Sequence, residues 1–142
     1  MSEYEIYDLL NSGLSANGLF QIAVLIATFI AFRVARFSQT SSLLAKIMST
    51  AFGLMTVFFG LTVGAVRYAS QETAAIRLAD LKAAGKPISP GSEAWIAQYG
   101  AEAGTYASQN YFADMGTVAI SLVIAIIVLG TTWGPKIDFG NG

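Results

Sequence analysis

Apolar residues are grouped into three long runs, which short polar or charged segments separate. The runs cover residues 14–33, 46–66 and 115–133. Arg33 ends the first run, Lys46 and Arg67 bound the second, and Asp114 and Lys136 bound the third. Each run has the roughly 20 residues that a helix needs to cross the hydrocarbon core of a bilayer. No ionisable side chain lies in the interior of any run. The pattern therefore predicts three transmembrane helices.

The N-terminal segment, residues 1–12, has a helical pattern of its own. Ser2 and Glu5 have the spacing of a capping box, and the tyrosines, leucines and isoleucine that follow give the segment one apolar side. Residues 11–13, Asn-Ser-Gly, are expected to end this helix. We predict a short interfacial helix along the membrane surface. The alternative is an extension of the first transmembrane helix.

Residues 67–114 connect the second and third runs and are too long for a bare loop. The first arm is rich in Ala, Leu, Arg and Lys and ends at Gly85, while Ser89 and Pro90 are suited to start a second helix. The return arm toward residue 114 carries glycines at 100 and 104, which weaken it or break it. The pattern predicts an extramembrane helical hairpin, and the chain is predicted to be an all-α integral membrane protein.

On the return arm, Trp95, Tyr99 and Tyr106 share one face of a helix together with Ala103. Exposed aromatic residues are frequent at protein interfaces. These three residues are therefore the predicted extramembrane partner face.

Composition narrows the function. Hydrophobic residues make up 54% and charged residues 12%, with a net charge of −1, so no basic surface is available for nucleic acid. The chain contains neither Cys nor His, which excludes disulfides, thiolate chemistry, the usual zinc sites and Ser-His catalysis. We predict no catalytic residue, no metal site and no enzymatic activity of the chain itself.

Charge placement predicts the orientation. The N-terminal segment has no Lys or Arg, unlike a secretory signal peptide, so the first apolar helix is expected to remain as an anchor. The connection 33–46 has three basic residues and no acid, whereas 67–114 has four basic residues spread over 48 positions. The positive-inside rule then places the N-terminus outside and the tail 134–142 in the cytoplasm. A bacterial inner membrane is the expected location.

Small residues form a stripe along one face of the second apolar run. They are Ser49, Gly53, Thr56, Gly60 and Gly64. No strand precedes these glycines and no lysine stands beside them, so they do not form a phosphate-binding loop. In membranes such a stripe allows another helix to approach closely. The stripe is predicted to be a helix-packing interface, with the partner left open: another helix of this chain, a second copy or a different subunit.

Two further features concern chemistry. Arg67 and Asp114 stand at the two ends of the hairpin and are a possible ion pair. The acid–base candidates of a membrane enzyme would be Glu93, Glu102 and Asp114. No ionisable residue inside a span indicates a proton or ion pathway.

These features favour a non-catalytic accessory subunit, which packs into a larger membrane complex or a homo-oligomer. In general appearance the chain is similar to small accessory subunits of respiratory, photosynthetic or monooxygenase complexes, a likeness of class rather than of family. The expected partners are membrane lipids and other membrane subunits or copies of the chain. The alternatives are a membrane enzyme subunit and an oligomeric channel or transporter component, with a pore lined by Thr56, Thr62, Thr117 and Ser121. No cofactor is predicted, and a bound lipid, quinone or pigment stays open.

Overall fold

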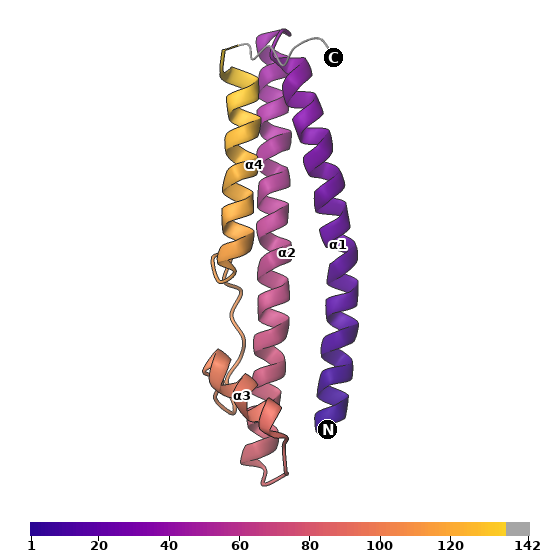
Figure 1. Cartoon of the computed structure of the whole chain (residues 1–142), viewed down its shortest axis with the longest axis vertical. Helices are drawn as coiled ribbons and strands as arrows, with labels where there is room; N and C mark the ends of the chain where they lie inside the picture. The colour runs from indigo at the N-terminus through magenta and orange to yellow at the C-terminus, as the bar shows by residue number, and fades with distance from the viewer. Residues whose placement is uncertain (136–142) are drawn as a thin grey trace. The chain divides into compact units, whose positions relative to one another are not determined.

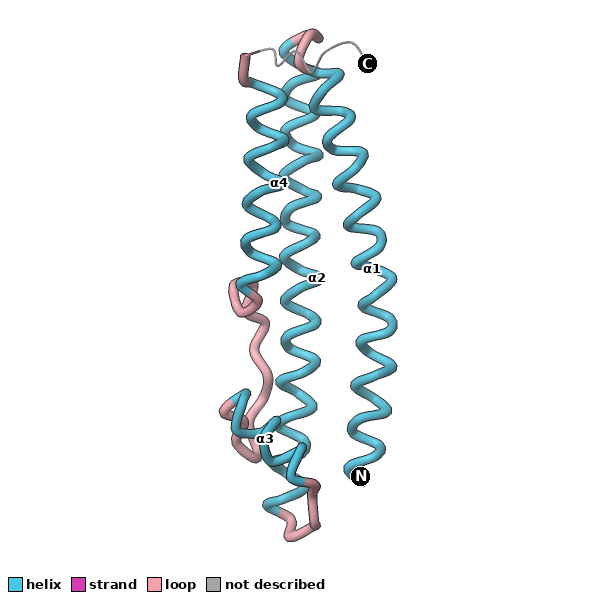
Figure 2. Tube along the Cα trace, in the orientation of Figure 1, coloured by secondary structure: helices cyan, strands magenta, loops and turns pink. Residues whose placement is uncertain are grey.

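The structure is a computed structural model that describes residues 1–135, and this part of the chain is all-α (Figures 1 and 2). Its helices are α1 (Glu3–Ser38), α2 (Leu43–Ala83), α3 (Pro90–Tyr99) and α4 (Met115–Trp133). Three of them, α1, α2 and α4, are long and apolar enough to cross a membrane. The structure thus confirms the all-α class and the three candidate spans. Most of the predicted cytoplasmic tail, residues 136–142, lies outside the described residues.

The chain divides into two compact units, and α1 and α2 each contribute to both. Unit 1 consists of Met1–Leu19 and Gly64–Ala113, and unit 2 consists of Phe20–Val63 together with the chain from Asp114 onward. Each unit has its own set of buried residues.

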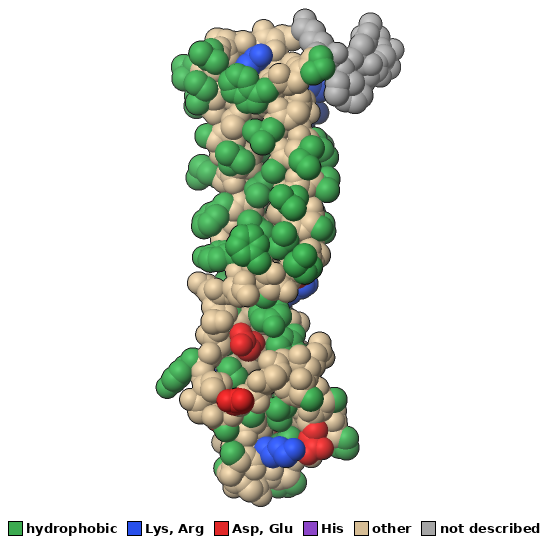
Figure 3. Space-filling view, turned by 90° about the vertical axis from the view of Figure 1, so that its left-hand side faces the viewer, with side chains coloured by type: hydrophobic (Ala, Val, Ile, Leu, Met, Phe, Trp, Pro, Cys, Tyr) green, Lys and Arg blue, Asp and Glu red, His purple; other side chains and the backbone are tan. Residues whose placement is uncertain are grey.

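Unit 2 contains parts of α1 and α2 and the whole of α4, which run side by side (Figure 1). Its buried cluster joins Ala31 and Ala35 of α1 to Val128 of α4. Large apolar side chains point outward around this cluster, and Figure 3 shows them along the face that includes α4. Leu25, Met55 and Ile126 are each more than two-thirds exposed. Side chains of this kind on the outside fit a unit that lipid surrounds.

The end of unit 2 near residue 133 is tied together by polar contacts. Trp133 Nε1 donates a hydrogen bond to Thr50 Oγ1 at 2.8 Å, and Lys46 Nζ lies 5.7 Å from the centre of the Trp133 ring. Gln39 Nε2 also donates to the carbonyl oxygen of Pro135 at 3.2 Å. A tryptophan with a polar partner and a nearby lysine is typical of the membrane–water boundary.

The predicted break at residues 11–13 is absent, because α1 runs without interruption from Glu3 to Ser38. Residues 1–12 therefore do not form a separate helix. A glycine inside a helix costs only about 1 kcal/mol. Burial of Ile6 and Leu10 against α2 offsets that cost. The capping box itself is confirmed: Ser2 N donates to Glu5 Oε2 and Glu5 N donates to Ser2 Oγ.

Unit 1 has a core between the first turns of α1 and the later turns of α2. Its buried members are Ile6, Leu10, Ala74, Leu78 and Leu81. Trp95 and Ile96 of α3 also pack against this cluster. The buried residues of α2 in this cluster thus face α1 as well as α3.

The ends of α3 explain how far the return arm extends. Ser89 caps the helix through a hydrogen bond to Ser92 N, and Pro90 occupies the first turn, as predicted. The helix ends at Tyr99 because Gly100 adopts a left-handed conformation with φ +58°. Gly104 also has a positive φ, and its N–H donates to Asp80 Oδ1 at 2.7 Å. The prediction of a helical arm continuing toward residue 114 is therefore wrong beyond Tyr99.

Candidate functional site

The small-residue face of α2 lies against other helices of the same chain in unit 2. Ser49 is fully buried, and its Oγ lies 3.4 Å from Thr132 Oγ1 of α4. A Cβ added to Gly53 would stand closer than 3.0 Å to Val128 Cγ1, nearer than real Cβ atoms approach such a group. The close approach of α2 and α4 at this point therefore requires glycine at position 53.

The rest of this face is similarly covered. Thr56 is buried and donates a hydrogen bond to the carbonyl oxygen of Phe52. A Cβ at Gly60 would meet Val24 of α1 at 3.4 Å and Ser121 Oγ of α4 at 3.8 Å. Gly64 is buried within the part of α2 that belongs to unit 1. The helices against Gly53 and Gly60 are α4 and α1 of this chain.

Most hydroxyl groups that would line the pore of the channel alternative donate hydrogen bonds within or at the start of their own helices. Thr62 Oγ1 donates to the carbonyl oxygen of Phe58, and Thr117 Oγ1 donates to Asp114 Oδ2. Thr56 bonds within α2, as described, and Ser121 is 4% exposed. No observation in the described residues favours a water-filled pore lined by this set.

Four aromatic rings form a continuous cluster in unit 1. Trp95 lies 6.2 Å from Tyr7 in an edge-on arrangement and stacks on Tyr99 at 5.9 Å. Tyr99 in turn lies 5.5 Å from Tyr68 of α2. Both residues of α3 also bond to Gln71: Trp95 Nε1 donates to its carbonyl oxygen and Tyr99 OH to its Oε1. This cluster fixes α3 against α1 and α2.

The structure does not bring Tyr106 into this cluster. Trp95 and Tyr99 are partly buried by their neighbours, whereas Tyr106 lies beyond the end of α3 and is 94% exposed. The three residues predicted as one helical face are therefore not on one helix. Sequence reasoning missed Tyr7, Tyr68 and Gln71, although Tyr68 and Gln71 are three residues apart on one helix and so share a face.

A carboxylate that the sequence did not single out is partly enclosed beside the aromatic cluster. Glu72 Oε2 is buried and has no hydrogen-bond partner among residues 1–135. Burial raises the pKa of the Tyr99 hydroxyl, and the nearby Tyr68 and Glu72 act in the same direction while Arg67 opposes them.

Two of the three predicted acid–base candidates, Glu93 and Asp114, have structural partners. Glu93 Oε1 accepts from Lys82 Nζ at 2.7 Å on the surface of unit 1. Asp114 caps α4, and its Oδ1 accepts from the N–H groups of Gly116 and Thr117. The pairing of Asp114 with Arg67 stays a prediction. In residues 1–135, no three side chains of the His, Cys, Asp or Glu type are grouped so that they could hold a metal ion.

Glu3 connects the start of α1 to the cap of α3. Its Oε1 accepts hydrogen bonds of 2.5 Å from both Ser89 Oγ and Ser92 Oγ, and its Oε2 accepts from Ser89 N at 3.1 Å. Tyr7 OH lies 2.8 Å from the fully buried Ser92 Oγ. The hydroxyl of Ser89, and then that of Ser92, hold the pKa of the Glu3 carboxyl below its ordinary value of 4.5.

This link is expected to weaken in acid. A carboxyl whose pKa is lower in the folded state contributes stability above 4.5, and this contribution is lost as the pH falls through the lower folded value. In a Trp133→Phe background, Trp95 fluorescence should shift to longer wavelength as the pH falls from 6 to 3. Glu3→Gln should abolish this transition, while Glu93→Gln, which removes a surface carboxylate of the same unit, should keep it. An unchanged transition in Glu3→Gln would contradict the assignment.

Comparison with known proteins finds no matching protein-family model, no matching curated protein and no matching solved structure.

Proposed function

We propose that the chain is a non-catalytic integral membrane subunit, which joins a larger membrane complex or an oligomer through surfaces on both units. The supporting observation is the exposure of large aromatic residues outside the three apolar runs. Tyr106 is 94% exposed and Phe112 is 67% exposed, and both lie on the segment between α3 and α4. Aromatic side chains in such positions supply much of the binding energy at protein interfaces.

The internal packing of α2 limits where a partner can bind in the membrane. Gly53 and Gly60 already face α4 and α1, so a second chain would approach the outward side of α2. That side has an apolar hollow lined by Leu54, Met55, Phe58, Phe59 and Thr62. We propose this hollow as the membrane contact and the residues around Tyr106 as the extramembrane contact.

The orientation proposed is the one that the basic residues favour. Residues 33–46 face the cytoplasm of a bacterial cell, and the N-terminus and residues 67–114 face the other side of the inner membrane. The subunit then presents its exposed aromatic residues to extracytoplasmic partners.

The proposal predicts that Tyr106→Ala combined with Phe112→Ala lowers recovery of partner chains about tenfold. Loss of two exposed aromatic contacts of roughly 0.7 kcal/mol each weakens the affinity about tenfold, because about 1.4 kcal/mol corresponds to a factor of ten. The measurement is purification of the tagged full chain in mild detergent, with partners identified by mass spectrometry and complex size by chromatography. Gln98→Ala, an exposed change on α3, is the matched control.

Four outcomes separate the alternatives. A complex containing only copies of this chain identifies a homo-oligomer, and one with other chains identifies an accessory subunit. Equal recovery from the double variant and the control would show that the aromatic residues do not bind the partner. A chain that is monomeric under all mild conditions would overturn the proposed function.

A further inference from the structure

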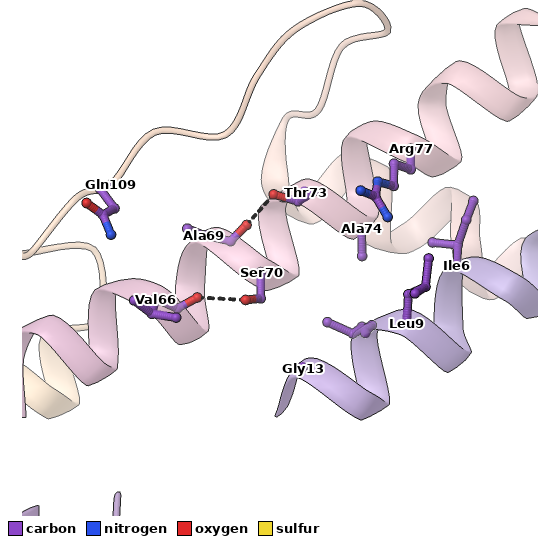
Figure 4. Close-up of a pocket in the computed structure, with 11 residues that line it drawn as sticks. Ile6, Leu9, Gly13, Val66, Ala69, Ser70, Thr73, Ala74, Arg77 and Gln109 are labelled. Carbon is purple, nitrogen blue, oxygen red and sulfur yellow. Dashed lines mark hydrogen bonds between the residues drawn. The ribbon is translucent and has the colours of Figure 1, made fainter. Parts of the chain in front are cut away.

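Two adjoining hollows lie in unit 1 between the first turns of α1 and the later turns of α2. The first has a volume of about 280 Å³, and Figure 4 shows Leu9 and Gly13 on one wall facing Ala69 and Ser70 on the other. Its lining residues are Ile6, Leu9, Leu10, Gly13, Val66, Ala69, Ser70, Thr73, Ala74, Arg77 and Gln109.

The walls of this first hollow are apolar although two of its residues carry hydroxyl groups. Ser70 Oγ donates to the carbonyl oxygen of Val66, and Thr73 Oγ1 donates to that of Ala69, as the dashed lines in Figure 4 show. Both hydroxyl protons are thus used within α2. Carbon atoms remain to contact an occupant, and the polar groups left for one are the side chains of Arg77 and Gln109.

The second hollow is charged and has a volume of about 350 Å³. It shares Ile6 and Arg77 with the first, so the two hollows meet at these residues. Its other lining residues are Met1, Asp80, Leu81, Ala84 and Lys86. The two neighbouring hollows, here together called the groove, have an apolar end and a charged end, and each volume is close to the lower limit of about 300 Å³ that is usual for a small-molecule site.

Arg77 is the cation at the junction. Its side chain is exposed, and it makes no hydrogen bond or ion pair with the residues that the structure describes. Asp80, the acid of the second hollow, already accepts a hydrogen bond from Gly104 N at 2.7 Å. Lys86 Nζ makes only a 3.3 Å contact with the carbonyl oxygen of Met1. The charged end thus has two cations for an anionic group beside the one carboxylate of Asp80.

The order of the apolar and charged ends of the groove follows the direction of α2. Val66 lies at the apolar end and is the last residue of the second apolar run, and Arg77 lies about 16 Å further along the same helix. A lipid in the adjacent leaflet has the same polarity, because its chains point toward the bilayer centre and its headgroup points away. An amphiphile can therefore occupy the groove without reversing its orientation, but it has to move outward from the leaflet by about the same 16 Å, because the second apolar run ends at Val66.

We propose that this groove binds one acyl chain of an anionic phospholipid, with the headgroup phosphate on Arg77 and Lys86. The guanidinium group of Arg77 can bind a phosphate through two parallel hydrogen bonds. The acyl chain then covers Leu9 and Val66, which are 50% and 39% exposed. A zwitterionic lipid carries the same phosphate, but its headgroup also has a positive charge. Arg77 and Lys86 repel this charge, so a zwitterionic lipid is expected to bind more weakly. This site does not depend on the proposed assembly with other subunits.

The test is native mass spectrometry of the pure full-length chain in mild detergent, with phosphatidylglycerol or phosphatidylcholine of identical acyl chains added. Phosphatidylglycerol should bind at least fivefold more tightly, and Arg77→Gln should remove about fivefold of its affinity. Arg77→Lys should retain most of the preference. Lys82→Gln, which removes a cation of α2 outside the groove, should leave binding unchanged.

A second variant tests the apolar end. Ala69→Phe places a ring in the first hollow and should abolish the tightly bound lipid while leaving weak, unselective lipid binding. Circular dichroism and thermal melting of each variant verify that it is folded. Equal binding of the two lipids, or full binding by folded Arg77→Gln or Ala69→Phe, would overturn the site. Displacement of phosphatidylglycerol by millimolar inorganic phosphate would also overturn it, because the site would then bind a free anion.

Discussion

Replacing Gly53 with alanine is expected to destabilise unit 2 by roughly 1–3 kcal/mol, the usual cost of overfilling a packed contact. The added methyl group would stand closer than 3.0 Å to Val128 Cγ1 and 3.3 Å from Cγ2. Val128 is 1% exposed and belongs to the buried cluster of this unit, so it has little room to move. Relief of the clash requires that α2 and α4 separate.

Thermal unfolding of the purified chain in detergent measures this effect. Val128→Ala removes the atoms that clash, so the double variant Gly53→Ala with Val128→Ala should be more stable than the two single effects predict. Gly130→Ala is the matched control, because nothing lies within 4 Å of the added methyl group. Gly60→Ala should also be tolerated, since its new contact with Val24 is an ordinary 3.4 Å. A Gly53→Ala protein as stable as Gly130→Ala would refute the close contact of α2 with α4.

The second large effect is expected for Leu78→Ala in unit 1. Leu78 is fully buried among Ile6, Leu10 and Leu81, and truncation of a leucine in such a place costs roughly 2–5 kcal/mol. The loss should fall on unit 1, because α4 and the buried cluster of unit 2 contain none of these residues. Limited proteolysis should then cut the chain near α3 much faster than in the unaltered protein.

Leu9→Ala provides the comparison for this prediction. Leu9 stands on the same part of α1 but is 50% exposed, so its truncation should have a small effect on cleavage. Similar cleavage rates for the Leu9 and Leu78 variants would contradict the assignment of the core of unit 1. Faster cleavage of Leu78→Ala that is confined to unit 2 would also contradict it.

The candidate spans were predictable because a helix that crosses a bilayer needs about 20 apolar residues without charge in its interior. Both properties can be read from one sequence. α4 covers the residues of the third apolar run, Met115–Trp133. Capping of α3 by Ser89 was predictable for a similar reason, because capping depends on residues within one helical turn. The end of α3 at Tyr99 was predictable only in part. The sequence indicates that Gly100 weakens the helix, but it does not indicate the left-handed conformation of Gly100 that ends it.

The predictions that were wrong, and the features that were missed, concern contacts between segments far apart in the sequence. The Asn-Ser-Gly sequence at residues 11–13 resembles a helix end, and only the burial of Ile6 and Leu10 against α2 explains why α1 continues. The prediction of one aromatic face was wrong because α3 ends at Tyr99. Tyr106 follows at a spacing that would share a helical face, but it lies outside the helix. The groove with Arg77 and the link from Glu3 to α3 join residues more than 60 positions apart, and no local pattern encodes such a pairing.

The composition of unit 1 has a consequence for biosynthesis. Its core joins Ile6 to Leu78, and Glu3 bonds to Ser92, so the first turns of α1 have no partners until the ribosome has made most of the chain. Closing a loop of about 70 residues carries an entropic cost of roughly 4 kcal/mol before any contact forms. Membrane insertion of α1 and α2 reduces that search by holding both helices in one bilayer. Unit 1 therefore completes its fold late, and an insertion error in either helix leaves its apolar residues exposed to aggregation and quality-control proteases.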